Sequence, residues 1–264
     1  MTFVDVAVII PVYNGATTIL RALESVLMQS VGVKEIWIID DCSSDNTVAL
    51  ISDYLQGFTE ELPRINILCS DTNCGPGLSR NKAWDLSQAE YIAFLDADDA
   101  WAHDKIELQI KSMHNDSDCY LTCHGSFFPR TIKDTKPKMV ELKALLFRNT
   151  IYTRTVMLRR EIPLRFKAGL SEDFDLWIRC LQEGYQIRFL AEPVAYHFKK
   201  DFSKAGISGQ LIKHEYWEIR RVFAAIRRSP SLILIGIASI LFSILKFFRR
   251  IFIRLIRTLM RQEA

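Results

Sequence analysis

The sequence predicts an α/β fold in which a mostly parallel central sheet is flanked by helices. Strand-like apolar runs and helix-like segments alternate four times in the first hundred residues, which is typical of βαβ units. The runs Val4–Val12 and Tyr91–Leu95 are almost entirely apolar, as in strands buried on both faces. Polar and acidic residues follow these runs at their C-terminal ends, the edge at which open α/β sheets bind ligands.

Four strand–helix units are expected in the first half of the chain. Pro11 should end the first strand because proline has no N–H to donate to a sheet. Thr17 or Thr18 could cap the first helix. The expected strands are residues 4–12, 35–39, 65–69 and 91–95, and the expected helices begin at or near residues 19, 47, 78 and 103.

The second half is less regular. Ser171 is expected to cap a helix that stops before Gly184, and residues 129–138 read as a polar loop. The other expected elements are strands at residues 119–128, 155–160 and 186–198 and a short helix at 139–147.

Basic residues are concentrated at the C-terminal end. Six of the 34 Lys and Arg residues but only one of the 31 Asp and Glu residues follow Arg228, which leaves the first 228 residues with a net charge of −2. A nearly neutral body argues against nucleic acid as its partner. The composition, 49% hydrophobic and 25% charged, is that of an ordinary globular enzyme.

The six cysteines favour a reducing compartment. There is no Cys-x-x-Cys motif, and a core of this size needs no disulfides, so we expect free, buried thiols in the cytoplasm. Cys119, Cys123 and His124 lack the spacing of a zinc site, and we interpret them as core residues. Residues 1–5 lack the basic start of a signal peptide, and none is expected.

Two carboxylates at the end of the Tyr91–Leu95 run are candidates for chemistry. Asp96 and Asp98 are two positions apart, so in extended backbone they point to the same side. Two hard oxygen ligands on one side could hold a divalent metal against a diphosphate. For this motif alone, an acidic turn that caps the following helix is the more frequent interpretation.

Five motifs together resemble glycosyltransferase family 2, whose members are nucleotide-sugar enzymes of the GT-A fold. The resemblance covers about residues 5–200, and the motifs stand in the family's order. They are residues 8–14 (Val-Ile-Ile-Pro-Val-Tyr-Asn), 38–47 (Ile-Ile-Asp-Asp-Cys-Ser-Ser-Asp-Asn-Thr), 77–83 (Gly-Leu-Ser-Arg-Asn-Lys-Ala), 91–99 (Tyr-Ile-Ala-Phe-Leu-Asp-Ala-Asp-Asp) and 171–177 (Ser-Glu-Asp-Phe-Asp-Leu-Trp).

The resemblance implies a donor site in the first half of the chain. Asp41 matches the family's nucleotide-reading aspartate, and because a carboxylate can accept from the imide N–H of uracil, it favours a UDP donor. Asp98 would bind Mg²⁺ or Mn²⁺, and Asp96 would contact the ribose or the metal. The residues that would form the wall around the base are Pro11, Tyr13 and Asn14.

The resemblance also implies roles in the second half. Asp173 would be the general base that deprotonates the acceptor hydroxyl, and Glu172 would orient Asp173 or the acceptor. Arg80 could meet phosphate, although a surface arginine is nearly as frequent at such a position. His197 falls where many members carry a residue that touches the diphosphate or the metal, and a structural histidine is equally compatible with its context.

The C-terminal segment reads as a tail with its own role. Residues 232–245 are apolar but short for a membrane span of about 20 residues. From Lys246, basic residues recur on one helical face and apolar residues on the other, which suits a helix lying on an anionic membrane surface. The alternative is a helical hairpin that packs on the body or on a second subunit. We therefore expect a GT-A domain at residues 1–205, with a nucleotide half (1–100) and an acceptor half (101–205), and a helical tail at 206–264.

The leading hypothesis is an inverting, metal-dependent glycosyltransferase on the cytoplasmic face of the cell membrane. It would move a sugar from a nucleotide sugar, UDP-linked by preference, to a hydroxyl of a lipid-linked or cell-surface glycan. Two alternatives stay open, a sugar-phosphate nucleotidyltransferase and a membrane-recruited protein that binds nucleotide sugars without turnover. The first would need a glycine-rich, arginine-bearing loop after the first strand, where residues 13–17 are Tyr-Asn-Gly-Ala-Thr.

Overall fold

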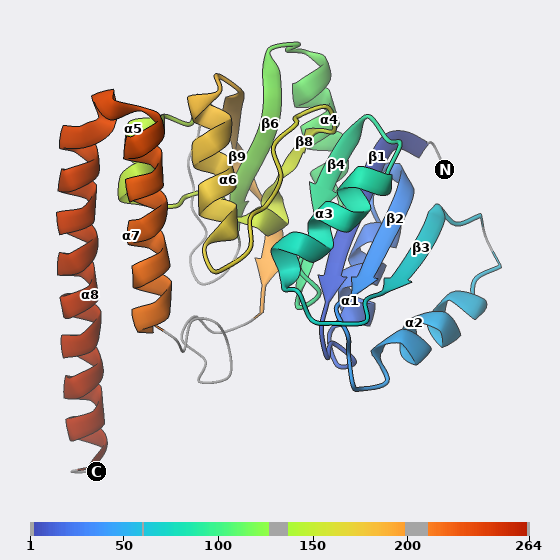
Figure 1. Ribbon diagram of the computed structural model, residues 1–264. Helices are drawn as coiled ribbons and strands as arrows, with labels where there is room; N and C mark the ends of the chain where they lie inside the picture. The colour runs from blue at the N-terminus through green and yellow to red at the C-terminus, as the bar shows by residue number, and fades with distance from the viewer. Residues whose placement is uncertain (1–2, 60, 127–136, 199–210, 263–264) are drawn as a thin grey trace.

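The computed structural model describes residues 3–59, 61–126, 137–198 and 211–262, and shows a mixed sheet flanked by helices with a helical hairpin at one end (Figure 1). The sheet has nine strands in the order β3-β2-β1-β4-β8-β6-β9-β5, with β7 paired to β9. The strands are β1 (Phe3–Val12), β2 (Gly32–Asp40), β3 (Arg64–Cys69), β4 (Tyr91–Phe94), β5 (Asp99–Trp101), β6 (Cys119–Ser126), β7 (Lys138–Met139), β8 (Met157–Arg159) and β9 (Gln186–His197). The helices are α1 (Ile19–Leu27), α2 (Thr47–Gln56), α3 (Pro76–Leu86), α4 (Lys105–His114), α5 (Leu142–Phe147), α6 (Glu172–Gln182), α7 (Leu211–Arg228) and α8 (Ile233–Gln262), with 3₁₀ turns η1 (Thr153–Thr155) and η3 (Pro230–Leu232).

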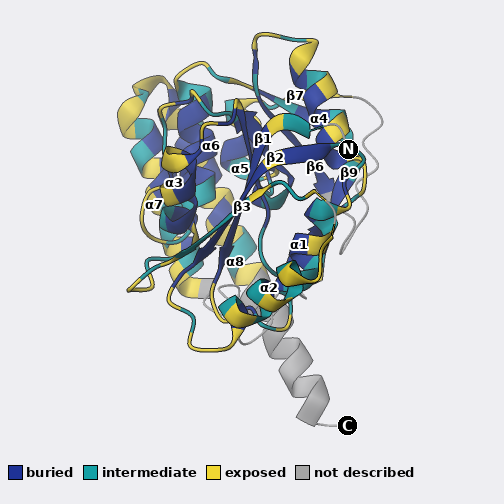
Figure 2. Cartoon of the chain, turned by 90° about the vertical axis from the view of Figure 1, so that its right-hand side faces the viewer, coloured by how far each residue is buried: buried dark blue, intermediate teal, exposed yellow. Residues whose placement is uncertain are grey.

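The central strands are buried on both faces, as their apolar runs predict. Alternate residues of β1 enter two different cores: Ala7 and Ile9 pack with α3 and α6, whereas Val8 and Ile10 pack with α1, α2 and α4. This division follows from the two-residue period of a strand. Figure 2 shows the same layering, with buried strands between helices that expose their outer surfaces.

The prediction of parallel strands holds for β3, β2, β1 and β4. The expectation that Pro11 ends β1 is wrong, because the strand continues to Val12. Ile9 directs its carbonyl toward β4, where it accepts from Leu95 N–H at 3.1 Å. Pro11, two residues on, faces the same side beyond the last paired residues of β1 and β4, so its missing N–H removes no bond between these two strands.

The second half of the sheet is mixed. β8 is antiparallel to β4 and β6, whereas β6 is parallel to β9. The helix predicted at residues 139–147 starts at Leu142, because Lys138 and Met139 pair with β9. The strand predicted at 155–160 is shortened by the turn η1. Most of the loop predicted at 129–138 lies outside the described residues.

The chain ends in a hairpin of α7 and α8 that packs against α5 and α6. Val222, Ala225 and Leu232 share the core of α3 and α6. The close approach of the two helices requires Gly236, since a Cβ there would lie 2.4 Å from Ile226 Cδ1. The hairpin packs on the body, as one of the two interpretations of the tail expects, and α8 also has an apolar outer face. Residues 230–249 are long and apolar enough to cross a membrane, with 22% of the segment buried. The boundary expected at 205/206 lies outside the described residues.

The cysteines are all free. Cys119, Cys123 and Cys180 are buried as expected, but Cys42 and Cys69 are exposed. Both exposed thiols belong to the edge formed by the ends of β2 and β3, where the sheet meets solvent.

Candidate active site

A cleft of about 830 Å³ opens at the C-terminal ends of β1 and β4. One side comes from the loops after these strands and is called the strand-end wall here. It comprises Pro11, Tyr13, Asn14, Asp96, Ala97 and Asp98. The opposite side, called the helix wall, comes from η1 and the beginnings of α6 and α7. It comprises Thr153, Ser171, Glu172, Asp173 and His214. Predicted residues that are 74 positions apart at their nearest, Asp98 and Glu172, thus face one cleft.

The two carboxylates after β4 both line the strand-end wall. Asp96 accepts a hydrogen bond from Arg80, while the backbone carbonyl of Asp98 accepts from Arg21 Nη2 at 2.7 Å. The guanidinium of Arg21 in turn stacks on Phe198, 3.9 Å from the ring centre. The turn that carries Asp98 is therefore held in place by a cation from α1.

Arg80 connects the two walls. Its side chain is only 5% exposed; one guanidinium nitrogen contacts Asp96 and the other lies 3.4 Å from Glu172 Oε1. The guanidinium also lies over the ring of Phe166, 5.3 Å from its centre. Arg80 is therefore a buried residue that offsets the negative charge of both walls, and not the surface arginine that the sequence left open.

Asp173 stands at the start of α6 with few partners. Its Oδ2 accepts from Asn149 Nδ2 at 3.2 Å and from Thr153 Oγ1 at 3.4 Å, and its Oδ1 accepts from the N–H of Phe174 at 2.7 Å. Burial raises the pKa of Asp173 above its usual value, although the Phe174 N–H, Arg80 and His214 oppose the rise. A carboxylate whose pKa is raised is a stronger proton acceptor than one in water.

Glu172 is the second acid of the helix wall. Burial, with the adjacent Asp173 charge, raises the pKa of Glu172 to about 7, and Arg80 limits the rise. Two neighbouring acids that share a buried site cannot both ionise easily. The pair is thus suited to carry one negative charge near neutral pH.

Ser171 does not cap α6 as expected. It adopts a left-handed conformation with φ of 55° and makes no side-chain capping bond. An N-cap serine normally has an extended backbone that directs its oxygen at the first helical N–H groups. The sharp turn into α6 instead brings the backbone of Glu172 and Asp173 to the cleft.

Asp41 is buried beside the strand-end wall and is not among the described residues that line the cleft. Its oxygens accept from the N–H groups of Cys74 at 3.0 Å and Gly75 at 2.7 Å. Burial alone would raise the pKa of Asp41, but these backbone bonds and the Cys74 thiol lower it below its usual value. Asn14, which lines the cleft, is tied to the same region because its Oδ1 accepts from the N–H of Ser44 at 2.8 Å.

His197 is not among the described residues that line the cleft. It lies on β9 opposite Asp99 of β5, and its Nδ1 is 2.8 Å from Asp99 Oδ1. Arg154 approaches the other oxygen of Asp99 at 3.5 Å. Burial raises the pKa of Asp99, and the hydrogen bond with His197 opposes the rise. The strand β5 thus places a bonded His–Asp pair directly behind Asp98.

Three residues near Asp173 were not singled out from the sequence. Thr153 and Asn149 bond its carboxylate, and His214 of α7 lines the cleft with its Nδ1 3.4 Å from Glu218 Oε1. For His214 the available signal was a histidine and a glutamate four positions apart, which share one helical face. Thr153 and Asn149 lie in an irregular segment that offers no such signal.

The cleft offers some of the oxygen ligands that a metal ion needs, and the substrate would supply the others. Within the part of the chain that is described, no three His, Cys, Asp or Glu side chains form a group that could hold a metal ion. Asp96 and Asp98 supply hard oxygen atoms, which suit Mg²⁺ or Mn²⁺ bound through one or two carboxylates and substrate phosphates. The residues present fit a metal that a diphosphate helps to hold.

Comparisons with known sequences agree with this geometry. Residues 7–171 match the family model described as Glycosyl transferase family 2. The chain is 34% identical over 191 residues to the putative teichuronic acid biosynthesis glycosyltransferase TuaG of Bacillus subtilis, covering 68% of this chain and 73% of that protein. It is 30% identical over 184 residues to the UDP-Glc:alpha-D-GlcNAc-diphosphoundecaprenol beta-1,3-glucosyltransferase WfgD of Escherichia coli, covering 68% and 70%.

Solved structures show the same fold. The mannosyltransferase PcManGT of Pyrobaculum calidifontis, in complex with GDP-Man and Mn²⁺, superposes with a TM-score of 0.69 at 18% identity, covering 90% of this chain and 69% of that chain. TarS 1–349 of S. aureus, in complex with UDP-GlcNAc, has a TM-score of 0.65 at 18% identity, covering 84% and 66%. The predicted α/β fold with a central sheet flanked by helices is confirmed.

Proposed function

Because the chain belongs to glycosyl transferase family 2 and is therefore a glycosyltransferase, we propose that it moves a sugar from a UDP-sugar to a hydroxyl of a lipid-linked or cell-surface glycan, with inversion. Membership of this family argues against the two alternatives, a sugar-phosphate nucleotidyltransferase and a protein that binds nucleotide sugars without turnover. The single observation that carries the proposal is the cleft itself, in which the acids of the strand-end wall face the acids of the helix wall.

The helix wall supplies the base in this proposal. Asp173 takes the proton of the acceptor hydroxyl as that oxygen attacks the anomeric carbon, and the bond to the nucleoside diphosphate breaks on the opposite side. Asn149 and Thr153 hold the carboxylate in one orientation. Burial raises the pKa of both Glu172 and Asp173, so the two acids would share one negative charge near neutral pH, and Asp173 acts as the base when it is the ionised member.

The strand-end wall binds the donor. Pro11, Tyr13 and Asn14 border the nucleotide, Asp41 reads the base from behind them, and Asp98 and Asp96 would hold Mg²⁺ or Mn²⁺ against the diphosphate. When bound, this metal would neutralise charge that grows on the departing diphosphate. Arg80 is close enough to Asp96 to add a second positive charge there. His197 would act on the metal site only indirectly, through its hydrogen bond to Asp99, the residue next to Asp98.

The acceptor class and the location are inferred from relatives and from the hairpin. WfgD is named for a diphosphoundecaprenol-linked substrate and TuaG for teichuronic acid, so a lipid-linked or surface glycan is the acceptor that fits this group. The outer face of α8 exposes Leu234, Leu241 and Leu245, and basic residues follow from Lys246 onward. That combination supports attachment to an anionic, cytoplasmic membrane face.

A panel of nucleotide sugars tests the donor half of the proposal. One UDP-sugar should raise the melting temperature of the protein in the presence of Mn²⁺, since a ligand at 100 times its Kd adds about 2.7 kcal/mol of stability. Asp98→Asn should remove most of that stabilisation, and Asp85→Asn, which changes an exposed carboxylate that pairs with Arg165, should keep it. Stabilisation of Asp98→Asn equal to that of the wild type would remove Asp98 from the metal site. If no UDP-sugar stabilises the protein, the donor is wrong.

A further inference from the structure

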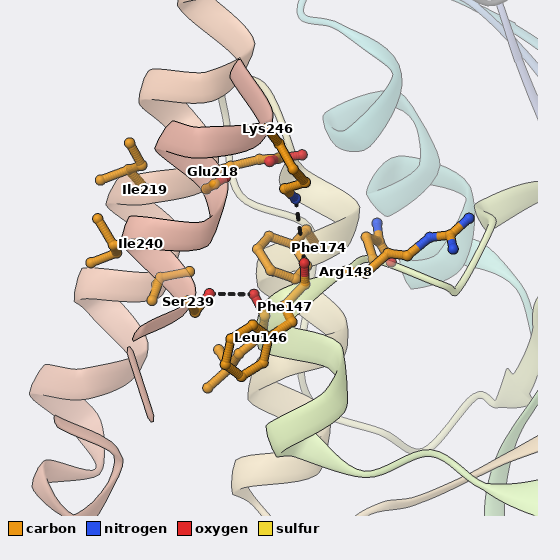
Figure 3. A pocket seen from close by; sticks show the side chains of 12 residues that line it. Leu146, Phe147, Arg148, Phe174, Glu218, Ile219, Ser239, Ile240 and Lys246 are labelled. Carbon is orange, nitrogen blue, oxygen red and sulfur yellow. Dashed lines mark hydrogen bonds between the residues drawn. The ribbon is translucent and has the colours of Figure 1, made fainter. Parts of the chain in front are cut away.

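A second cavity, of about 160 Å³, lies between α5, α6 and the α7–α8 hairpin (Figure 3). Its lining mixes apolar side chains with cations, hydroxyls, an amide and the carboxylate of Glu218. The lining residues from α5 and α6 and the loop between them are Leu146, Phe147, Arg148, Asn149 and Phe174, and those from the hairpin include Ser239, Ile240, Ser243 and Lys246. At about 30 Å³ per water molecule, the cavity has the volume of about five water molecules, which suits the compact head group of a ligand and is too small for a nucleotide.

This cavity is separated from the active cleft by a single layer of side chains. Asn149 lines the cavity and donates to Asp173 of the cleft at 3.2 Å. Glu218 lines the cavity and lies 3.4 Å from His214 of the cleft. Phe174, adjacent to Asp173 in α6, forms part of the same partition. A ligand in the cavity would therefore lie directly behind the proposed base.

A polar stripe of α8 faces this cavity. Ser239 donates to the carbonyl of Leu146 at 2.5 Å, and Lys246 Nζ donates to the carbonyl of Phe147 at 3.3 Å (Figure 3). Ser243, between them, bonds Glu215 of α7. Lys246 and Arg148 are the two cations of the lining. Arg148 is exposed, and in Figure 3 its guanidinium points away from α8, so it stands at the rim.

The opposite face of α8 is apolar and open to solvent. Leu234, Leu241 and Leu245 are 79%, 58% and 68% exposed. One helix thus presents an apolar surface on one side and a cation-bearing cavity on the other. A ligand that combines an apolar chain with an anionic head group matches both features, because the chain would stay in the membrane and the head group would meet the cations.

We propose that this cavity binds the diphosphate of a lipid-linked acceptor, with Lys246 as the cation inside it and Arg148 as a cation at its rim. The inference rests on the proposed function, because it assigns the acceptor of the same cleft. The cations would hold the diphosphate behind the partition, and the attached sugar would reach Asp173 when the side chain of Asn149, which contacts both spaces, moves aside. Specificity for a diphosphate-linked sugar over a free glycan would then come from α5 and α8. Of these two helices, α5 lies within residues 7–171, which the family model matches, and α8 lies outside them.

Binding of farnesyl diphosphate to the full chain in detergent tests this site. UDP and Mn²⁺ are kept at saturation so that the active cleft is occupied. Pyrophosphate and farnesol serve as probes for the head group and the chain alone. We expect farnesyl diphosphate to bind more tightly than either. Lys246→Met, which keeps an apolar stem, should weaken it by about tenfold or more, as for loss of a charge-assisted hydrogen bond, and Arg148→Met should weaken it less because Arg148 stands at the exposed rim. The matched controls are Arg249→Met and Lys143→Met, which remove exposed cations of α8 and α5 that do not line the cavity.

The outcomes separate this inference from the proposed function. Equal affinity of Lys246→Met, Arg148→Met and the two controls would overturn the cavity as a diphosphate site. Equal binding of farnesol and farnesyl diphosphate would overturn it as well, because the membrane-facing surface alone would then explain the affinity. Failure of UDP to bind with Mn²⁺ would instead refute the donor half of the proposed function. Circular dichroism melts of all four variants establish that each is folded.

Discussion

The two walls of the cleft hold their acids in different ways. Asp41, behind the strand-end wall, accepts two backbone N–H groups at 2.7 and 3.0 Å, and its pKa is lowered although burial opposes this. Asp173, in the helix wall, accepts one backbone N–H at 2.7 Å and two long side-chain bonds at 3.2 and 3.4 Å, and burial raises its pKa. A carboxylate with a backbone donor on each oxygen is held as an anion, whereas one with a single backbone donor and long side-chain bonds, and with a raised pKa, takes up a proton more readily.

Asp173→Asn should have the largest effect. The amide keeps the size of the side chain but cannot accept a proton, so we expect sugar transfer to fall about 10²–10⁴-fold, the usual contribution of a general base. UDP-sugar affinity should not change, because the strand-end wall is intact. Single-turnover kinetics and a thermal shift titration measure the two effects.

The control for this change is Glu183→Gln, at the exposed C-terminal end of α6. It should transfer sugar at the wild-type rate. A folded Asp173→Asn protein with wild-type transfer would assign the base to another residue and remove the contrast between the walls.

Membrane attachment tests the outer face of α8, the helix that packs behind the helix wall. Replacing Leu234, Leu241 and Leu245 of α8 by Gln should move the protein from vesicles containing phosphatidylglycerol to the soluble fraction, because each buried leucine contributes about 1.5–3 kcal/mol. These side chains are largely exposed, so the fold should persist. Co-sedimentation measures the shift.

A matched triple change uses exposed apolar residues elsewhere, Met28, Leu86 and Met139. That variant should stay with the vesicles. If the α8 variant also stays bound, the outer face of α8 is not the attachment surface.

Asp41→Asn should reduce stability, in addition to weakening the base recognition proposed for Asp41. Both carboxylate oxygens accept N–H groups, and an amide can satisfy only one of them, so we expect a loss of about 1–3 kcal/mol in the free energy of unfolding. Urea denaturation measures it, with Asp71→Asn in an exposed loop as control. An unchanged free energy of unfolding would mean that Asp41 is no anchor.

Glu172→Gln should produce the smallest effect, a change in pH dependence. The pKa of Glu172 is about 7 in the folded protein, against an ordinary 4.5. Between these values the folded state binds more protons than the unfolded state, so this group's stabilising contribution is complete below about pH 4.5 and is lost as pH rises through 7.

The glutamine variant lacks this loss. Its stability relative to the wild type should therefore increase from pH 5 to pH 8 by at least about 1.4 kcal/mol, the equivalent of one pKa unit. Urea denaturation at both pH values checks this. A difference that does not vary with pH would show that Glu172 is already ionised and that the two acids share no charge.

Sequence reasoning was most accurate where structure is local. The helix predicted from Thr47 begins there, and the strands β1 to β4 were each anticipated, because a strand buried on both faces has a recognisable apolar run. The short strands β5 and β7 and the turn η1 were missed, since two or three residues are too few to show a period. Their positions depend on pairing with β9 and on contacts across the sheet.

The amino-acid sequence by itself determined the order of strands and helices in the first half, the five motifs and the family, because periodicity and motif spacing are properties of neighbouring residues. Only the tertiary structure decided which acids meet. It placed Arg80 between Asp96 and Glu172, brought His214 and Asn149 to the side of Asp173, and bonded His197 to Asp99. These contacts join residues up to about a hundred positions apart, and they arise when α6 and the hairpin pack on the sheet and close the cleft.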